Sequence, residues 1–163
     1  MDRHALAGYT SISPWIVTSD TGRLLDFVRA VFEGEEVARI QLDDGTIGHA
    51  EIRVGDTVLL AFDRRPGWPE LTSLLRVFVQ DADATIARAV ASGARVVTPV
   101  STHAFGQRVG RIRDPFGNLW WIAAVVEDVA PGEVMRRLAE PAYAQAMREA
   151  QETLDLELQR PGP

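Results

Sequence analysis

The chain has 163 residues, a mass of 17.9 kDa and a formal net charge of −6. A chain of this length can bury a core of its own, its acidic balance argues against a nucleic-acid partner, and no stretch approaches the ~20 apolar residues that span a bilayer. It contains no cysteine and no lysine, which excludes thiolate and Schiff-base chemistry. The segment MDRHALAGYTSIS lacks the apolar core of a signal peptide, so we expect a cytoplasmic protein.

The first half of the chain predicts four strands and one helix in the order β-α-β-β-β. A strand at 10–17 precedes Ser19 and Asp20, which form an N-cap signal for a helix over TGRLLDFVRAVF. Gly34 ends this helix, and strands follow at 36–42, 46–54 and 57–63, separated by turns rich in Asp and Gly. Residues 64–71 contain two prolines and a glycine and predict a linker.

The same order then begins again. A strand at 73–80 leads to a helix that Asp81 opens and Gly93 closes, and strands follow at 94–100, 107–114 and 118–126. Matching Asp20 to Asp81 gives an offset of 61 residues, and matching Gly55 to Gly117 gives 62. We therefore predict an α+β fold in which two tandem βαβββ modules, at about 10–63 and 73–126, curl a mixed sheet into a cup.

Residues 127–163 predict a helical extension beyond a domain at 1–126. Pro131 suits the first position of a helix over PGEVMRRLAE, and a second helix runs from Pro141 to about Leu158. One face of the second helix carries Tyr143, Ala146, Met147, Ala150 and Leu154. Two interpretations stay open: this helix packs on its own domain, or it forms a dimer contact.

The stretch RIRDPFGNLWWIA, at 111–123, joins two strands through a turn of Asp, Pro, Gly and Asn. Paired βαβββ modules with D-P-F-G-N entering the last strand resemble the vicinal oxygen chelate superfamily of glyoxalases, bleomycin-resistance proteins and extradiol dioxygenases, over about 10–126. HAEIRVGDTVLL, FGQRVGRIRDPFGNLWWIA and VEDVAPGEVMRR are most similar to a glyoxalase-like branch associated with phosphonate gene clusters. The resemblance implies a ligand on the inner face of the cup, and a homodimer.

Metal-dependent members of that superfamily take His or Glu ligands from the first and fourth strands of each module. The corresponding positions in this chain, counted from each module's own landmarks, are Ser13, Leu59, Leu74 and Trp121. A serine hydroxyl, two alkyl chains and an indole cannot hold a divalent ion. The usual metal is therefore expected to be absent, and no cofactor is expected.

Strand alternation predicts which side chains line the cup. His49 and Glu51 face it as a candidate acid–base pair, and an offset of 62 makes Arg111 and Arg113 their counterparts. The ligand-binding candidates are Trp15, Arg76, Phe78, Phe105, Arg111, Arg113 and Trp121. The alternatives are a plain apolar core and, for the charged residues, ion pairs on a solvated face. His103, in the same loop as Phe105, is expected to be solvated.

Three functions remain possible from the sequence. The chain could bind a small, partly aromatic or anionic molecule without chemistry. It could be a lyase, isomerase or dioxygenase that uses His49 and Glu51 as acid and base or as relocated metal ligands. It could also be a regulatory domain in which the C-terminal helices matter more than the cup. Whether the chain is an enzyme stays open.

Overall fold

The computed structural model describes residues 5–160, and the chain divides into Met1–Ser73 and Leu74–Pro163, called unit 1 and unit 2 below. The outer ends of the predicted segments 1–126 and 127–163, including His4, lie outside the described residues. No helix within the described part of the chain is long and apolar enough to cross a membrane.

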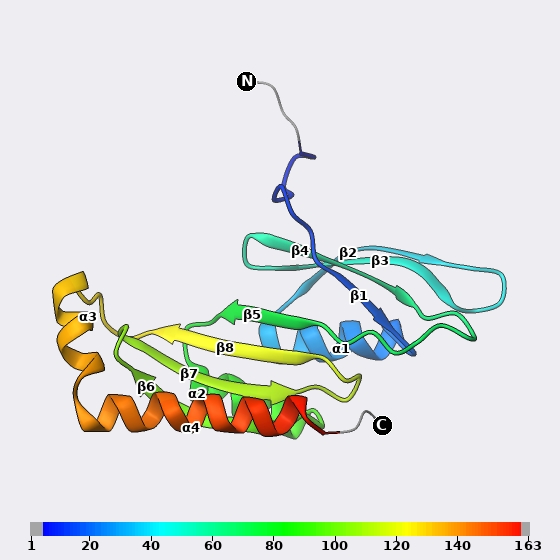
Figure 1. Cartoon of the computed structure of the whole chain (residues 1–163). Coiled ribbons are helices and arrows are strands. Elements are labelled where there is room, and N and C mark those ends of the chain that lie inside the picture. The colour runs from blue at the N-terminus through cyan, green and yellow to red at the C-terminus, as the bar shows by residue number, and fades with distance from the viewer. Residues whose placement is uncertain (1–4, 161–163) are drawn as a thin grey trace. The chain divides into compact units, whose positions relative to one another are not determined.

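Unit 1 is a four-stranded mixed sheet with one helix on it (Figure 1). Its elements are β1 (Trp15–Thr18), α1 (Thr21–Phe32), β2 (Glu35–Gln41), β3 (Ile47–Val54) and β4 (Thr57–Asp63). The strand order is β1-β4-β3-β2, with β1 parallel to β4 and the other pairs antiparallel. The Asp20 side chain accepts a hydrogen bond from the Arg23 amide, which caps α1 at the predicted residue.

Unit 2 repeats this topology. Its elements are β5 (Leu74–Phe78), α2 (Ala82–Ala91), β6 (Arg95–His103), β7 (Gln107–Arg113) and β8 (Leu119–Val125), and its strand order is β5-β8-β7-β6. Asp81 caps α2 as Asp20 caps α1. The predicted α+β class and the duplicated βαβββ unit are therefore confirmed.

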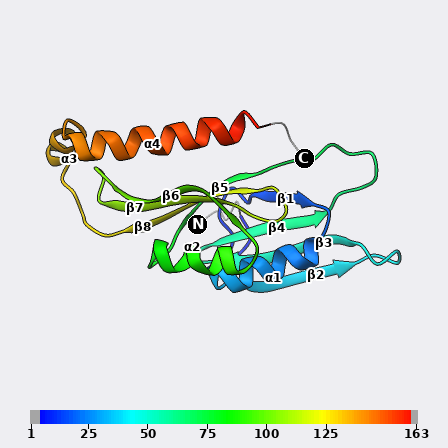
Figure 2. The same ribbon diagram turned by 90° about the horizontal axis from the view of Figure 1, so that it is seen from below.

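Two C-terminal helices complete unit 2: α3 (Pro131–Leu138) and α4 (Pro141–Leu158). Helix α4 packs along β6, whereas α2 contacts β6, β7 and β8. Figure 2 shows the two helices on opposite faces of this sheet. Helix α4 therefore packs on its own domain, which was the first of the two interpretations of the tail. The face that the sequence assigns to the cup is, in unit 2, covered by α4.

Alternation along β7 decides which residue meets which helix. Gly110 faces α2, where an added Cβ would lie 2.5 Å from the Ile86 side chain, so this position has no room for a larger residue. Arg108, on the same side, pairs with Asp83 of α2. The alternate residues, including Arg111, project toward α4.

Candidate functional site

The turn between β7 and β8 is organised by Asp114. Its carboxylate accepts hydrogen bonds from the amides of Phe116 and Asn118, at 2.9 and 2.8 Å. It also accepts from the Asn118 side chain and from the Trp120 indole, both at 2.9 Å. Gly117 has a φ of 90°, which a glycine adopts without strain. Trp120 is thereby fixed in the core at 2 % exposure, and the next side chain, Trp121, must face the other way.

Three side chains form a row across the sheet of unit 2. The strand register pairs Arg76 of β5 with Trp121 of β8, and Trp121 with Arg111 of β7. The guanidinium carbons of Arg111 and Arg76 lie 4.0 and 5.1 Å from the centre of the Trp121 ring. Both distances suit a cation–π contact, so the indole holds two positive charges beside it. The hairpin thus places Trp121 between two arginines.

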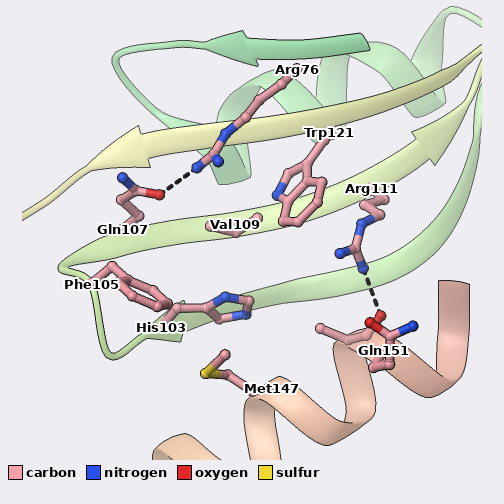
Figure 3. Close-up of a pocket in the computed structure, with 10 residues that line it drawn as sticks. Arg76, His103, Phe105, Gln107, Val109, Arg111, Trp121, Met147 and Gln151 are labelled. Atoms are coloured by element: carbon pink, nitrogen blue, oxygen red, sulfur yellow. Dashed lines mark hydrogen bonds between the residues drawn. The ribbon is translucent and has the colours of Figure 1, made fainter. Parts of the chain in front are cut away.

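This row forms one wall of a pocket of about 350 Å³ between the sheet of unit 2 and α4 (Figure 3). The volume is at the lower end of the range for small-molecule sites. The sheet and the β6–β7 turn contribute polar and aromatic groups, and α4 contributes the opposite wall. The lining residues are Arg76, His103, Phe105, Gln107, Val109, Arg111, Trp121, Met147, Ala150 and Gln151.

Arg111 carries the pocket's most buried charge, with 3 % of its surface exposed. Its Nη1 donates to the Ala150 carbonyl at 2.6 Å and to the Thr98 hydroxyl at 3.1 Å. Its Nε is buried, and no described residue supplies it with an acceptor. Burial, and then the neighbouring charge of Arg76, lower the Arg111 pKa from its ordinary value. A buried guanidinium without a counter-ion costs on the order of several kcal/mol, even after relaxation of the surroundings.

Hydrogen-bond donors without acceptors gather in this pocket. The Trp121 Nε1 is buried without a partner in the described part of the chain, and an indole N–H can only donate. Arg76 donates from Nη2 to the Gln107 side-chain oxygen at 2.5 Å (Figure 3). The lining contains no Asp or Glu among the residues that the structure describes. The pocket therefore offers two positive charges and unused N–H groups, and nothing negative of its own.

His103 lies in this pocket and is not solvated, contrary to the expectation from the sequence. It is 7 % exposed, and its Nε2 is buried without a partner. Strand β6 extends to His103, which pairs with Gln107 at the start of β7. The segment THAFGQ, expected to be a loop, thus begins with the end of β6, and strand pairing places the His103 imidazole in the pocket.

The other ligand-binding candidates are placed differently. Phe105 lines the pocket. Phe78 lies outside the lining at 59 % exposure, with its ring 4.9 Å from the Arg76 guanidinium carbon. Arg113 also lies outside it, because its Nε donates to Glu157 and its Nη1 donates to the Gly117 carbonyl at 2.5 Å. Trp15 belongs to unit 1.

His49 and Glu51 do meet in unit 1. The His49 Nε2 lies 2.9 Å from one carboxylate oxygen of Glu51, and the Tyr9 hydroxyl donates to the other. Both hydrogen bonds, that from Tyr9 first, lower the Glu51 pKa and keep it ionised. Because a carboxylate only accepts, the Nε2 of His49 must carry the hydrogen, and in the neutral imidazole Nδ1 is then the acceptor. The Trp15 ring packs edge-on against His49 at 5.6 Å between centres.

The strand registers correct the predicted equivalence between the modules. Leu60 pairs with Trp15 of β1 as Trp121 pairs with Arg76 of β5, at the offset of 61 that also relates the two helix caps. Glu51 is the β3 partner of Leu60 and Arg111 is the β7 partner of Trp121, so the counterpart of Glu51 is Arg111 at an offset of 60. The counterpart of Trp121 is Leu60 and not Leu59, which pairs with Ile52 instead. The turn glycines used to count the offset lie in turns of different length, two residues between β3 and β4 and five between β7 and β8.

The residues present do not fit the superfamily's usual metal. The strand register assigns the fourth-strand ligand position of unit 1 to Leu60 and not to Leu59. Leu60, like Leu74, offers no ligand atom. Within residues 5–160, no group of three or more His, Asp or Glu side chains is placed to hold a metal ion. The metal-free state of the protein stays a prediction.

Comparison with known families agrees with this architecture. The family model described as the Glyoxalase/Bleomycin resistance protein/Dioxygenase superfamily matches residues 6–122. The chain belongs to this superfamily. Within it, the chain is 30 % identical over 149 residues to the uncharacterised protein Rv0887c of Mycobacterium tuberculosis, covering 85 % of this chain and 88 % of that protein. A protein of Mycobacterium bovis, Mb0911c, is 31 % identical over 140 residues, covering 79 % and 92 %.

Solved structures of other proteins share the fold. TioX from Micromonospora sp. ML1 superimposes with a TM-score of 0.60 at 24 % identity, covering 71 % of this chain and 98 % of TioX. The fosfomycin resistance protein FosX from Mesorhizobium loti gives 0.57 at 14 % identity, covering 78 % and 98 %. At these identities the likeness concerns the fold alone.

Three pocket residues on α4 were not among the sequence candidates: Met147, Ala150 and Gln151. The helical face that contains Met147 and Ala150 is visible in the sequence. What the sequence does not supply is the partner of that face, because it depends on how the tail folds back over the sheet.

Proposed function

We propose that unit 2 binds a small organic anion with an apolar or aromatic body in the pocket between its sheet and α4. The observation that carries this proposal is the surplus of positive charge and unused donors at Arg111, Arg76 and Trp121. A carboxylate or similar oxyanion supplies the acceptors that these groups lack, and arginine forks suit its geometry. Phe105, Met147 and Val109 provide apolar surface for the rest of the molecule.

A thermal-shift panel tests the proposal. Benzoate, phenylacetate and naphthoate are each compared with the corresponding neutral amide, which has a closely similar shape. We expect the acids and not the amides to raise the melting temperature, because only the ionised form pairs with the arginines. Equal shifts from acids and amides, or no shift from any acid, would contradict the proposal. Phenylphosphonate joins the panel because the resemblance to the phosphonate-associated branch, which stays a prediction, favours such a group.

A matched pair of variants locates the binding. Arg76→Met removes a charge from the pocket wall. Arg88→Met removes one from an exposed position of α2, on the opposite face of the same sheet. The first variant should weaken acid binding about tenfold or more, as expected for loss of a charged hydrogen bond, and the second should not.

A second function, acid–base chemistry in unit 1, is favoured by the chain of contacts from Tyr9 through Glu51 to His49. The carboxylate fixes the tautomer of the imidazole, which is how a general base is oriented. Turnover of a substrate that disappears in His49→Ala and persists in Arg76→Met would establish this function in unit 1.

The homodimer and the cytoplasmic location expected from the sequence both stay predictions. Sedimentation velocity at micromolar concentration tests the first of them. A single species at the monomer mass would contradict it.

A further inference from the structure

His103 is the one ionisable group of the pocket lining, among the described residues, that the proposed anion site does not yet use. It lies at the end of β6 with its ring directed into the pocket, beside Met147 (Figure 3). Its Nε2 is buried and has no hydrogen-bond partner among residues 5–160. A buried imidazole nitrogen without a partner carries a desolvation cost that a suitably placed ligand atom would remove.

The charged groups that face His103 are both cations. Arg76 comes from β5 and Arg111 from β7. The other lining residues among those described are not acidic: Gln107 and Val109 of β7, Trp121 of β8, Phe105 of the β6–β7 turn, and Met147, Ala150 and Gln151 of α4. Burial first, then Arg111 and Arg76, lower the His103 pKa from its ordinary 6.5. Near pH 7 and without an anion beside it, the imidazole is therefore neutral.

An anion in the pocket counteracts both causes of the lowered His103 pKa, burial and the charges of the two arginines. Its charge offsets the field of the two arginines, and its oxygen accepts a hydrogen bond from a protonated Nε2. We propose that His103 is a third anion-binding residue, which takes up a proton from solvent as the anion enters, so that ligand and proton bind together. This rests on the proposed function of the same pocket and adds its proton linkage.

Thermodynamic linkage gives the direction in which anion affinity changes with pH. If anion binding favours protonated His103, protonation favours anion binding by the same factor. Affinity should then be greatest at low pH and fall as pH rises, by up to about tenfold per pH unit between the His103 pKa values of the free and bound states. Benzoate stays ionised throughout, because carboxyl groups titrate near pH 4. Any proton taken up therefore belongs to the protein.

Calorimetric titration of the full chain with benzoate measures this uptake. The titrations use bis-Tris, imidazole and Tris near pH 7, cationic buffers that cannot compete for an anion site. The dependence of the binding heat on the buffer's ionisation heat gives the number of protons bound. We expect a fraction of one proton per benzoate, absent in His103→Gln and retained in the matched control His4→Gln.

The outcomes separate the two proposals. Benzoate binding without proton uptake, or uptake that persists in His103→Gln, overturns the role of His103 and leaves the anion site standing. Failure of every acid of the panel to bind overturns both. A second measurement avoids the variant altogether: the ring resonances of His103 are titrated by NMR in the wild-type protein, with and without saturating benzoate. An apparent pKa that does not rise with benzoate also overturns the proposal.

Discussion

Arg111 carries a charge that no described residue of the pocket neutralises. Both groups that accept hydrogen bonds from it, the Ala150 carbonyl and the Thr98 hydroxyl, also contact the Thr153 hydroxyl. The Ala150 carbonyl also accepts from the Thr153 hydroxyl at 3.2 Å, and the Thr98 hydroxyl lies 2.7 Å from that of Thr153. Removal of the guanidinium therefore leaves neither group without a partner. The proposed anion would offset the cost of burying the Arg111 charge.

Arg111→Met is thus expected to separate stability from binding. The free energy of unfolding should stay within about 1 kcal/mol of the wild type or increase, because replacing buried charge by apolar volume is often neutral or stabilising. Acid binding should weaken about 10- to 100-fold, from the loss of a charged hydrogen bond. Urea unfolding and calorimetry measure the two. A large loss of stability would show that Arg111 is structural, and Arg88→Met serves as the control.

Asp114 acts on the fold and only indirectly on the pocket. Burial raises its pKa from the ordinary value, against the lowering effect of its hydrogen bonds from Trp120 and Asn118. Asp114→Ala removes the carboxylate that accepts the hydrogen bonds of the turn and should cost about 3 kcal/mol of unfolding free energy. Asp56→Ala, in the exposed turn between the equivalent strands of unit 1, should cost less than about 1 kcal/mol. Similar losses from both variants, in urea unfolding, would contradict this reading of the turn.

Helix α4 is held to the sheet at the end remote from Met147. Glu157, at 5 % exposure, accepts from Arg95 Nη2 at 2.7 and 2.9 Å and also from Arg113 Nε. The hydrogen bond from Arg95, with a contribution from Arg113, lowers the Glu157 pKa below its ordinary 4.5. The stabilisation of the folded state by the ionised Glu157 is therefore fully present above about pH 4.5 and is lost as pH falls through its lowered pKa.

Glu157→Gln should loosen α4 by about 2 kcal/mol, less than for a fully buried pair because Arg95 is half exposed. Hydrogen exchange of the α4 amides near neutral pH should accelerate in this variant, and much less in Glu152→Gln, an exposed position of the same helix. In the wild type the same acceleration should set in only below about pH 4.5. If neither Glu157→Gln nor acidification below about pH 4.5 accelerated exchange of the α4 amides, the ion pairs of Glu157 would not be what holds the helix.

The order of elements could be predicted because helix caps, periodicity and turn residues are local signals. Helix α1 spans the predicted residues, and the repeat predicted from its landmarks is present. Strand alternation also assigned Arg76 and Trp121 to one face. The exact offset could not be predicted, since one turn is longer than the other and a one-residue slip exchanged Leu59 for Leu60.

The α4 wall of the pocket could not be predicted for a different reason. Met147 and Ala150 lie on an apolar helical face, but such a face fits a domain, a second chain or a ligand equally well. The position of His103 likewise depends on pairing of β6 with β7 up to the turn, which is a tertiary contact. Residues whose role depends on non-local packing are therefore the ones that the sequence misassigned or missed.

At the scale of the whole molecule, the superfamily fold does not specify the chemistry. The usual ligand positions offer a single serine hydroxyl, so we expect far less than one metal ion per chain in untagged protein. Plasma mass spectrometry measures the content, and melting scans with Zn, Ni, Mn, Fe and EDTA should coincide with the scan of the untreated protein. Stoichiometric metal, or a shift of several degrees with one ion, would contradict this and point to His49 and Glu51.

The central claim is that the pocket of unit 2 discriminates charge and not only shape. Titration of benzoate and of benzamide into the wild-type protein, followed by calorimetry and by the fluorescence of its tryptophans, tests it most directly. We expect saturable binding of benzoate, at least about tenfold tighter than that of benzamide, and weakened by Arg111→Met. Equal affinity for the two compounds, or benzoate binding that Arg111→Met leaves unchanged, would contradict it.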